Sequence, residues 1–326
     1  MVRMLVALDG SHLAEVAIGH AAALAQSFES ELHLLTVIER DSDPDKPFDG
    51  FDWELRRTHA EAYLHRLQNE LTRQGIEVFR HVVEGHPPTE IISFCERHEI
   101  NLMFLSAYGI GGVTQFPCGS TVQKVIARAG LSAMVVRLEA PSATSIEPAR
   151  YRRILVLLDG SRRSDWVLSL AARLAQAHGA ELSLLQVNQE PKVTQRVLTN
   201  PRGRKLVEEL AEMNTLDSLR HMEEVKAQLP TSTKVRSRVL VASEVPPVVE
   251  EIARTDDVDL VVLCAHGMSD SDYWLYGPVS ETILAHTSRA VLVFQDDLRH
   301  NLTLTPVRRG PAPSLKADAD RRAEAG

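Results

Sequence analysis

An internal repeat constrains this 326-residue chain more than any other feature of its sequence. The segment Met4-Leu-Val-Ala-Leu-Asp9-Gly-Ser11 returns as Ile154-Leu-Val-Leu-Leu-Asp159-Gly-Ser161, and residues 4–38 and 154–188 are identical at 16 of 35 positions. Chance similarity between two amphipathic segments does not reach this level. The chain is therefore a tandem duplication, and two copies of one fold are expected.

Each copy alternates between short apolar runs, which predict strands, and segments with helical spacing of apolar residues. The first copy has expected strands at 3–8, 32–38, 77–83, 101–106 and 133–138, and expected helices at 12–28, 54–74, 88–98 and 120–129. The second copy has expected strands near 153–158, 181–187, 234–241, 259–264 and 290–295, with a longer helical region over roughly 192–229. Strands separated by helices of this length predict right-handed crossovers and a parallel α/β sheet in each copy.

Composition marks the boundaries of the two copies. We expect domains at 1–138 and 152–298, joined by a linker at 139–151 that contains Pro141 and Pro148. The last segment, 299–326, has no apolar period and is expected to be disordered.

Charge and composition exclude several classes of function. The net charge of −8 argues against nucleic acid as a partner, and no apolar stretch reaches the length of a membrane span. No secretory signal begins the sequence, so a cytoplasmic location is expected. Three widely spaced cysteines, Cys95, Cys118 and Cys264, form neither a disulfide framework nor a zinc or redox pair.

A glycine-rich segment joins the expected strand 101–106 to the expected helix 120–129. Its pattern is Ser106-x2-Gly109-x9-Gly119-Ser120-Thr121. Unpaired N–H groups and the positive end of the helix dipole suit an anion, and glycines let a ligand approach the backbone. The segment is therefore a candidate phosphate site, although it lacks the lysine of a Walker-type loop. In a doubly wound sheet, Asp9 at the end of the first strand would face Gly109 across a ligand-binding crevice.

The Asp-Gly-Ser turn and the spaced glycine loop together resemble the universal stress protein family, whose nucleotide loop is written G-x2-G-x9-G-[S/T]. Ser106 stands here in place of the first glycine. The resemblance covers nearly the whole chain apart from the linker and tail. It implies a strand order of 3-2-1-4-5 in each copy and the binding of ATP with Mg²⁺ or Mn²⁺. By position it implies adenine contacts from Asp9 and the backbone at Val37, and ribose and phosphate contacts from Ser106, Gly109, Gly119, Ser120 and Thr121.

Two of these residues have a simpler explanation that the sequence leaves open. Asp9 can serve only to order its own Asp-Gly-Ser turn by accepting hydrogen bonds from backbone amides. Ser120 can serve only as the cap of the helix that follows it, because capping and phosphate binding use the same geometry.

The second copy departs further from the family pattern. Its equivalent residues are Asp159, Val187, Gly267 and Gly277, so the spacing survives. However, Pro278 lacks the N–H and the hydroxyl that a serine would offer a phosphate, and Asp270 and Asp272 place negative charge in the loop. We therefore expect an active first site and a degenerate second site.

The sequence predicts a binding protein more than an enzyme. No histidine group shows metal-ligand spacing, and no lysine or arginine lies within 106–121 to stabilise phosphoryl transfer. The fifth strands would be apolar sheet edges, and the resemblance implies that they pair as an intramolecular pseudo-dimer, with a further homodimer left open. The expected function is a cytoplasmic stress-response protein that binds ATP and regulates an unknown protein partner. The alternatives are a nucleotide-independent interaction module and a slow ATPase or adenylyl-transfer enzyme.

Overall fold

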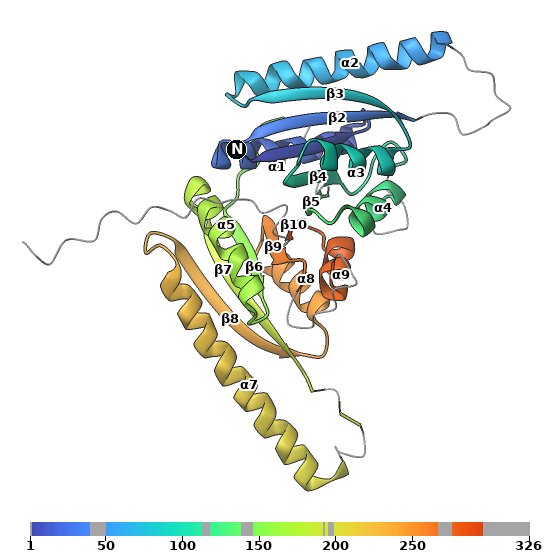
Figure 1. Ribbon diagram of the computed structural model, residues 1–326. Coiled ribbons are helices and arrows are strands. Elements are labelled where there is room, and N and C mark those ends of the chain that lie inside the picture. Colours follow the sequence, from blue (N-terminus) through green and yellow to red (C-terminus); the bar gives the residue numbers. More distant parts are fainter. Residues whose placement is uncertain are drawn as a thin grey trace, which may run out of the picture.

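The computed structural model describes residues 2–39, 50–112, 118–137, 146–191, 193–194, 199–266 and 276–295. Its first half contains β1 (Arg3–Leu8), α1 (His12–Phe28), β2 (Glu31–Glu39), α2 (Gly50–Arg73), β3 (Val78–Gly85), α3 (Pro87–Arg97), β4 (Leu102–Ser106), α4 (Ser120–Ala129) and β5 (Ser132–Val136) (Figure 1). Its second half contains β6 (Arg153–Leu158), α5 (Arg162–His178), β7 (Glu181–Gln189), α7 (Pro201–Gln228), β8 (Lys234–Ala242), α8 (Val245–Thr255), β9 (Leu260–Cys264), α9 (Pro278–His286) and β10 (Ala290–Phe294).

All described strands join one ten-stranded sheet of order β3-β2-β1-β4-β5-β10-β9-β6-β7-β8. Each half is parallel within itself and has the order 3-2-1-4-5 that the family resemblance implied. The halves meet where β5 and β10 pair antiparallel, with Val135 opposite Val291. The sheet as a whole is therefore mixed, and the two copies form the intramolecular pseudo-dimer expected from the sequence.

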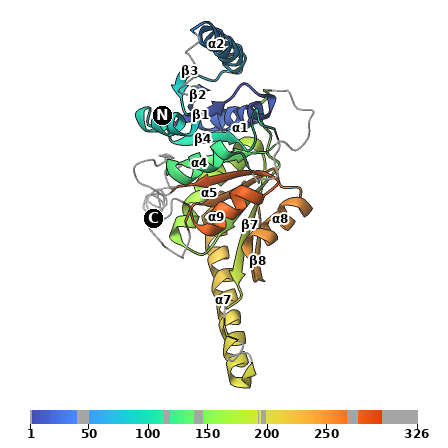
Figure 2. The ribbon, with the colours of Figure 1, turned by 90° about the vertical axis from the view of Figure 1, so that its right-hand side faces the viewer.

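Helices cover both faces of the sheet because its strands carry apolar side chains on both sides. One core cluster contains buried side chains of α1, α2, α5 and α7, and the other contains those of α3, α4, α8 and α9. Figure 2 shows the helices of both halves on either side of the shared sheet.

Side chains also join the halves across the β5–β10 seam. Nη2 of Arg137, just after β5, donates to the carbonyls of Leu284 and Ala285, both at 2.6 Å, at the C-terminal end of α9. The hydroxyl of the buried Tyr276 donates to the carbonyl of Leu131. A cation is favoured at a helix C-terminus, so Arg137 stabilises both α9 and the contact between halves.

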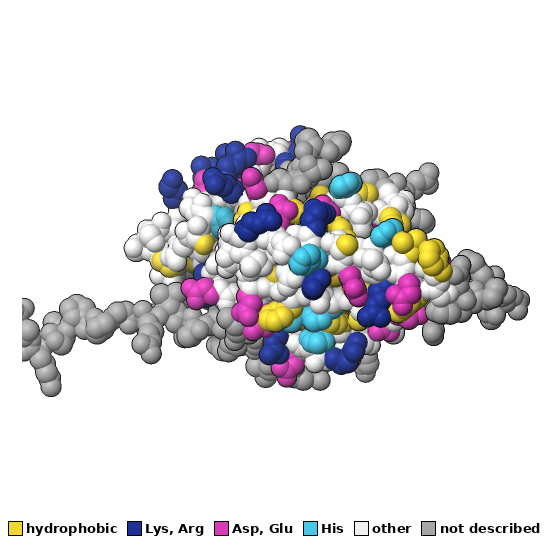
Figure 3. All heavy atoms as spheres, turned by 90° about the horizontal axis from the view of Figure 1, so that it is seen from above, with side chains coloured by type: hydrophobic (Ala, Val, Ile, Leu, Met, Phe, Trp, Pro, Cys, Tyr) yellow, Lys and Arg dark blue, Asp and Glu magenta, His cyan; other side chains and the backbone are white. Residues whose placement is uncertain are grey.

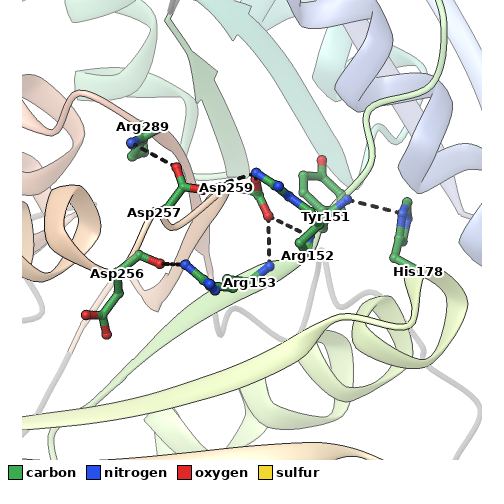
Figure 4. A network of polar contacts seen from close by, with 8 residues as sticks. All are labelled: Tyr151, Arg152, Arg153, His178, Asp256, Asp257, Asp259 and Arg289. Carbon is green, nitrogen blue, oxygen red and sulfur yellow. Dashed lines mark hydrogen bonds and ion pairs between the residues drawn. The ribbon is translucent and has the colours of Figure 1, made fainter.

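The described end of the linker packs against the first half. The N–H of Ala149 donates to the carbonyl of Gly19 in α1 at 2.8 Å, and Tyr151 is 2% exposed. Figure 4 shows how the second half then begins: Asp259 Oδ2 accepts the backbone N–H groups of Arg152, at 2.5 Å, and Arg153, at 2.8 Å. The first half has an equivalent contact at the start of β1, where the N–H of Arg3 donates to the side chain of Asn101 at 2.9 Å.

The long helix of the second half, α7, starts at Pro201, with the Asn200 side chain accepting the N–H of Arg202 as a cap. Asparagine at the cap and proline at the first helical position are a strong start signal. Residue 192 and residues 195–198 of the helical region expected from the sequence lie outside the described residues. Among the described residues, no helix is long and apolar enough to cross a membrane.

Three histidine rings cluster in the first half, and those of His33 and His81 are stacked. Nδ1 of His33 lies 3.1 Å from Nε2 of His81, and the ring of His98 lies 5.3 Å from that of His81. Burial lowers the pKa of all three rings, and the pKa of His81 falls from 6.5 to about 4, with the neighbouring imidazoles adding to the effect. Glu31 opposes this shift at His33, and Arg3 reinforces it.

This cluster predicts a loss of stability in mild acid. The unfolded chain binds protons near pH 6.5 whereas the folded rings resist them, so stability is complete above pH 6.5 and falls as the pH drops toward 4. Allowing for solvent screening of partly exposed rings, we expect a loss of about 1–2 kcal/mol between pH 7 and pH 4.5. Urea unfolding of the wild type and of His81→Phe at the two pH values measures this loss of unfolding free energy. The His81→Phe variant should lose less stability than the wild type, whereas His12→Gln, a change at an exposed position, should lose as much as the wild type.

Candidate functional site

The candidate site lies where the sheet order reverses, at the C-terminal ends of β1 and β4. These strands pair in parallel, so Asp9, which follows β1, and the glycine loop, which follows β4, lie side by side. Ligands of doubly wound sheets bind at such a point. The predicted proximity of Asp9 and Gly109 is confirmed.

Asp9 hydrogen-bonds to two loops at once. Its Oδ1 accepts the N–H and the hydroxyl of Ser11, at 2.9 and 2.6 Å, which is the turn-ordering role considered from the sequence. Its Oδ2 accepts the N–H of Ile110 at 2.6 Å, and this bond ties the glycine loop to the end of β1. A carboxylate oxygen has two lone pairs, so Oδ2 keeps one acceptor position for a further donor.

Gly109 has no room for a side chain unless Asp9 or the loop moves, because Asp9 lies directly against it. A Cβ at this position would lie 2.1 Å from Asp9 Oδ2. The turn then closes with a hydrogen bond from the N–H of Gly112 to the carbonyl of Gly109, at 2.8 Å, and Gly112 has a φ of +71°. A side chain at either glycine would displace the loop from this path.

The N-terminus of α4 supplies free amides. Gly119 is the N-cap residue and has no side-chain cap, and the first bond of the helical ladder runs from the N–H of Gln123 to the carbonyl of Gly119. Ser120 is the first residue inside the helix, so it is not the cap that the sequence left open. The N–H groups of Ser120, Thr121 and Val122 precede the ladder and, with the helix dipole, favour an anion.

These features surround one cavity of about 860 Å³. All seven residues singled out from the sequence of the first copy line it: Asp9, Val37, Ser106, Gly109, Gly119, Ser120 and Thr121. Their side-by-side arrangement is a finding of the structure, and their contact with a ligand stays a prediction.

One polar group on the cavity wall is available for a hydrogen bond to a ligand. Thr36 is 8% exposed, and its hydroxyl has no hydrogen-bond partner, although it lies among apolar residues of the wall. A buried hydroxyl without a partner costs free energy, so it is usually satisfied by a ligand or by water. Together with the free amides of α4, it shows that the residues present suit a polar ligand with an anionic end.

Helix α2 contributes a wall that the sequence analysis missed. Arg56, His59, Ala60 and Tyr63 all line the cavity. They lie three, four and seven positions apart, so they share one face of α2, and the buried Leu64 and Leu67 fix the direction of that face. The helical spacing was visible in the sequence, but which loop this face would meet was not. Arg56 brings a positive charge to the cavity and pairs with Asp52 one turn earlier.

The second half keeps part of the same framework. Oδ1 of Asp159 accepts the N–H of Ser161 at 3.0 Å, and the N–H of Gly277 donates to the carbonyl of Ala265 at 2.8 Å, as that of Gly119 does to Ala107. Val187 lies near the end of β7. Gly267, Asp270 and Asp272 lie outside the described residues. Pro278 occupies the first position of α9, so one of the N–H groups present in α4 is missing.

Three polar side chains of the second half stand where the first half has one polar and two apolar residues on the cavity wall. Gln186 donates to the hydroxyl of Ser218 at 2.9 Å, and that hydroxyl has two acceptors for its one hydrogen, the carbonyl oxygen of Asn214 at 2.7 Å and Oδ1 of Asn188 at 3.0 Å. The repeat places the three side chains at the positions of Thr36, Ala60 and Ile38 in the first half. These bonds leave Oε1 of Gln186 without a hydrogen-bond partner, as the hydroxyl of Thr36 is in the first half.

Metal ligands are not grouped in the described part of the chain. Among those residues, no set of three histidine, cysteine, aspartate or glutamate side chains is placed to hold an ion. Cys118, beside the glycine loop, is 5% exposed, and burial raises the pKa of its thiol, as expected for a small buried residue.

Comparison with known proteins agrees with this architecture. The model of the Universal stress protein family matches residues 1–137 and 150–295. A universal stress protein of Methanocaldococcus jannaschii is 24% identical over 139 residues, which is 41% of this chain and 81% of that protein. A solved universal stress protein from Archaeoglobus fulgidus, 18% identical, matches 90% of this chain and 98% of its own with a TM-score of 0.62.

A further solved structure is a universal stress protein in complex with cAMP. It is 22% identical and covers 45% of this chain and 98% of its own, with a TM-score of 0.30. That protein therefore binds a nucleotide. Because the family model covers both halves, this chain belongs to the universal stress protein family and carries two of its domains in tandem.

Proposed function

We propose that the first half, residues 1–138, binds ATP and that the presence of the nucleotide regulates contact with a protein partner during stress. The observation that carries the proposal is the uncapped N-terminus of α4, whose free amides meet the same cavity as Asp9 and Val37. A nucleotide requires of a protein a group of donors for its anionic phosphates and a neighbouring acceptor for its base. The cytoplasmic location stays a prediction from the sequence.

In this proposal the residues divide between the two ends of the nucleotide. Asp9, through the free lone pair of Oδ2, and the backbone at Val37 would receive the adenine. Ser106 and Gly109 would lie beside the ribose, and Gly119, Ser120 and Thr121 would hold the phosphates. Mg²⁺ or Mn²⁺ would arrive with the triphosphate and offset its charge, since the protein would hold that ion through the phosphates.

We propose a degenerate site in the second half, residues 152–298, with residues 139–151 as the linker between the domains. Asp159, Val187 and Gly277 keep their positions, but Pro278 removes a donor that α4 offers in the first half. Gly267 belongs to this lower-affinity set by its sequence position. Binding there should be weaker than in the first half.

One observation favours the enzymatic alternative, a slow ATPase or adenylyl-transfer enzyme. Arg56 lines the cavity and supplies a cation that the glycine loop lacks. A guanidinium beside a phosphate can stabilise charge in phosphoryl transfer. Arg56→Met would abolish any ADP or AMP release if this is its role, and would leave ATP release from the purified protein unaltered if the chain only binds.

The test of the main proposal is mass spectrometry of nucleotide released from freshly purified full-length protein, followed by thermal melting with Mg-ATP. We expect ATP in the released fraction, and a rise in melting temperature when Mg-ATP is added to stripped protein. A cyclic or monophosphate nucleotide instead would replace ATP in the proposal. No released nucleotide and no melting shift would overturn it and favour the nucleotide-independent interaction module.

A further inference from the structure

The histidine cluster, His33, His81 and His98, connects three elements of the first half. His33 lies on β2, His81 lies on β3, and His98 is the C-cap residue of α3. The 3.1 Å contact between Nδ1 of His33 and Nε2 of His81 is a hydrogen bond, so one ring must donate and the other must accept. The ring of Phe94, on α3, lies 4.7 Å from that of His81 and 4.0 Å from that of His98. The cluster therefore joins α3 to β2 and β3.

The cluster stays together only while at least one of the two bonded rings is neutral. A protonated imidazole carries N–H groups on both nitrogens, so two protonated rings have no acceptor for the bond between His33 and His81. His33 is 6% exposed, and a charge held there without a partner is costly. His81 and His98 are partly exposed, and Figure 3 shows histidine side chains at the surface on the side of the molecule where α2 and β3 lie, so solvent protons reach the cluster. Protonation therefore drives the rings apart and toward water.

Nearby charges stabilise at most one proton on the cluster. The charged side chains beside it, from β1, β2, α3 and the turn after α3, are Arg3, Glu31, Arg97 and Glu99. Glu31 lies 3.7 Å from Nε2 of His33 and so favours a proton there. Arg3 pairs with Glu31 at 3.4 Å and with Glu99 at 2.9 Å, and Arg3 and Arg97 both disfavour a charge on His98. Among these described neighbours, a second proton on the cluster meets no carboxylate that lacks a cation.

The second copy makes the same connection without a histidine. By strand register and by helix C-cap, the positions equivalent to His33, His81 and His98 are those of Ser183, Arg238 and Asp256. Nη2 of Arg238 lies 2.6 Å from Oδ2 of Asp256, so an ion pair joins α8 to β8. Arginine and aspartate side chains keep their charges between pH 7 and pH 5, whereas histidine does not. The two copies therefore differ in how the same connection responds to mild acid.

We propose that the histidine cluster is a proton-operated switch that releases β3 and α3 in mild acid, while β8 and α8 stay in place. Among the described strands β3 pairs with β2 alone, at one end of the sheet, so it and α3 can open without disturbing the central strands. Pro87 and Ile91 of α3 line the cavity of the candidate site, so their release opens one wall of it. The opening is a property of the empty protein and does not depend on whether the cavity binds ATP.

Hydrogen exchange of the full-length chain without nucleotide tests the switch. Amide exchange rates in α3 and α8 are measured at pH 7 and at pH 5 and divided by the intrinsic rates at each pH, which gives the opening equilibrium of each helix. Burial lowers the pKa of His81 to about 4, and a released ring returns to its ordinary value of 6.5, so opening is favoured as the pH falls below 6.5. Allowing for the partial exposure of this ring, we expect the opening of α3 to increase about 10-fold and that of α8 to change less than about 2-fold. Equal increases in both helices would mean that the whole protein loosens, and that result, or no increase in α3, rejects the proposal.

Transfer of the second copy's residues tests whether the histidines are the cause. The triple variant His33→Ser, His81→Arg and His98→Asp should open as little at pH 5 as at pH 7. The control is His86→Gln, because His86 is an exposed histidine at the N-cap of α3 without a side-chain cap bond, and this variant should keep the wild-type increase. A full increase in the triple variant, or its loss in His86→Gln, contradicts the proposal. If the triple variant does not fold at pH 7, the wild-type comparison of α3 with α8 still decides between the outcomes.

Discussion

Gly119→Glu is expected to abolish nucleotide binding without unfolding the protein. Gly119 has a φ of −63°, which any residue adopts, and a Cβ there has its nearest neighbour, the carbonyl oxygen of Ala107, at 3.5 Å. The Cβ of the new residue is therefore accommodated without a clash. Its carboxylate would stand at the helix N-terminus where the phosphates are proposed to lie. One such charge at roughly 5 Å from a phosphate costs about 3 kcal/mol at an effective dielectric near 20, which is about a 100-fold loss of affinity.

The second copy provides the matched control for this experiment. Gly277 is the N-cap residue of α9, as Gly119 is of α4, and has a φ of −66°. A Cβ there lies 3.2 Å from the carbonyl oxygen of Ala265, so Gly277→Glu is slightly the tighter substitution. Calorimetric titration with Mg-ATP should show binding lost in Gly119→Glu and retained in Gly277→Glu. Loss in Gly277→Glu alone would place the active site in the second half instead.

The fold was predictable because the internal repeat and the alternation of strand-like apolar runs with helical apolar spacing both indicate two copies of one α/β fold. Alternating strands and helices define a parallel sheet, and β1 and β4 then bring Asp9 to Gly109. The antiparallel contact of β5 with β10 followed from the apolar fifth strands and the family resemblance, and Val135 lies opposite Val291 as a result. These features depend on strand order, which the family resemblance implied and which alternation of strands and helices alone does not determine.

The site was predictable only where its residues lie at strand ends. The face of α2 with Arg56, His59 and Tyr63 meets the cavity because of how α2 packs on the sheet, and packing depends on distant residues. The same holds for the bond between Asp9 and Ile110, since a backbone N–H carries no signature in the sequence. A helix start is different, because Asn200 and Pro201 mark that of α7 in the sequence itself.

Gly109→Ala is expected to destabilise the protein even when no nucleotide is present. The new Cβ would lie 2.1 Å from Asp9 Oδ2 and 3.2 Å from Asp9 Cγ. Either the carboxylate or the loop must move, and the bond from the N–H of Ile110 is lost. We expect a cost of about 1–3 kcal/mol, measured by urea unfolding of nucleotide-free protein. Gly111→Ala is the control, because a Cβ at Gly111 meets nothing within 4 Å, and it should change stability by no more than about 0.5 kcal/mol.

A double-mutant cycle identifies the clash with Asp9 as the cause. Asp9→Ala removes the carboxylate, so adding Gly109→Ala to it should cost little more than Asp9→Ala alone. The two effects should therefore fall short of additivity by about 1–2 kcal/mol. Strict additivity would mean that the glycine is needed for its backbone freedom and not for its distance from Asp9. Coupling in the nucleotide-free protein would show that Asp9 shapes the glycine loop before any ligand arrives, so that loss of nucleotide binding in an Asp9 variant includes the loss of a formed site.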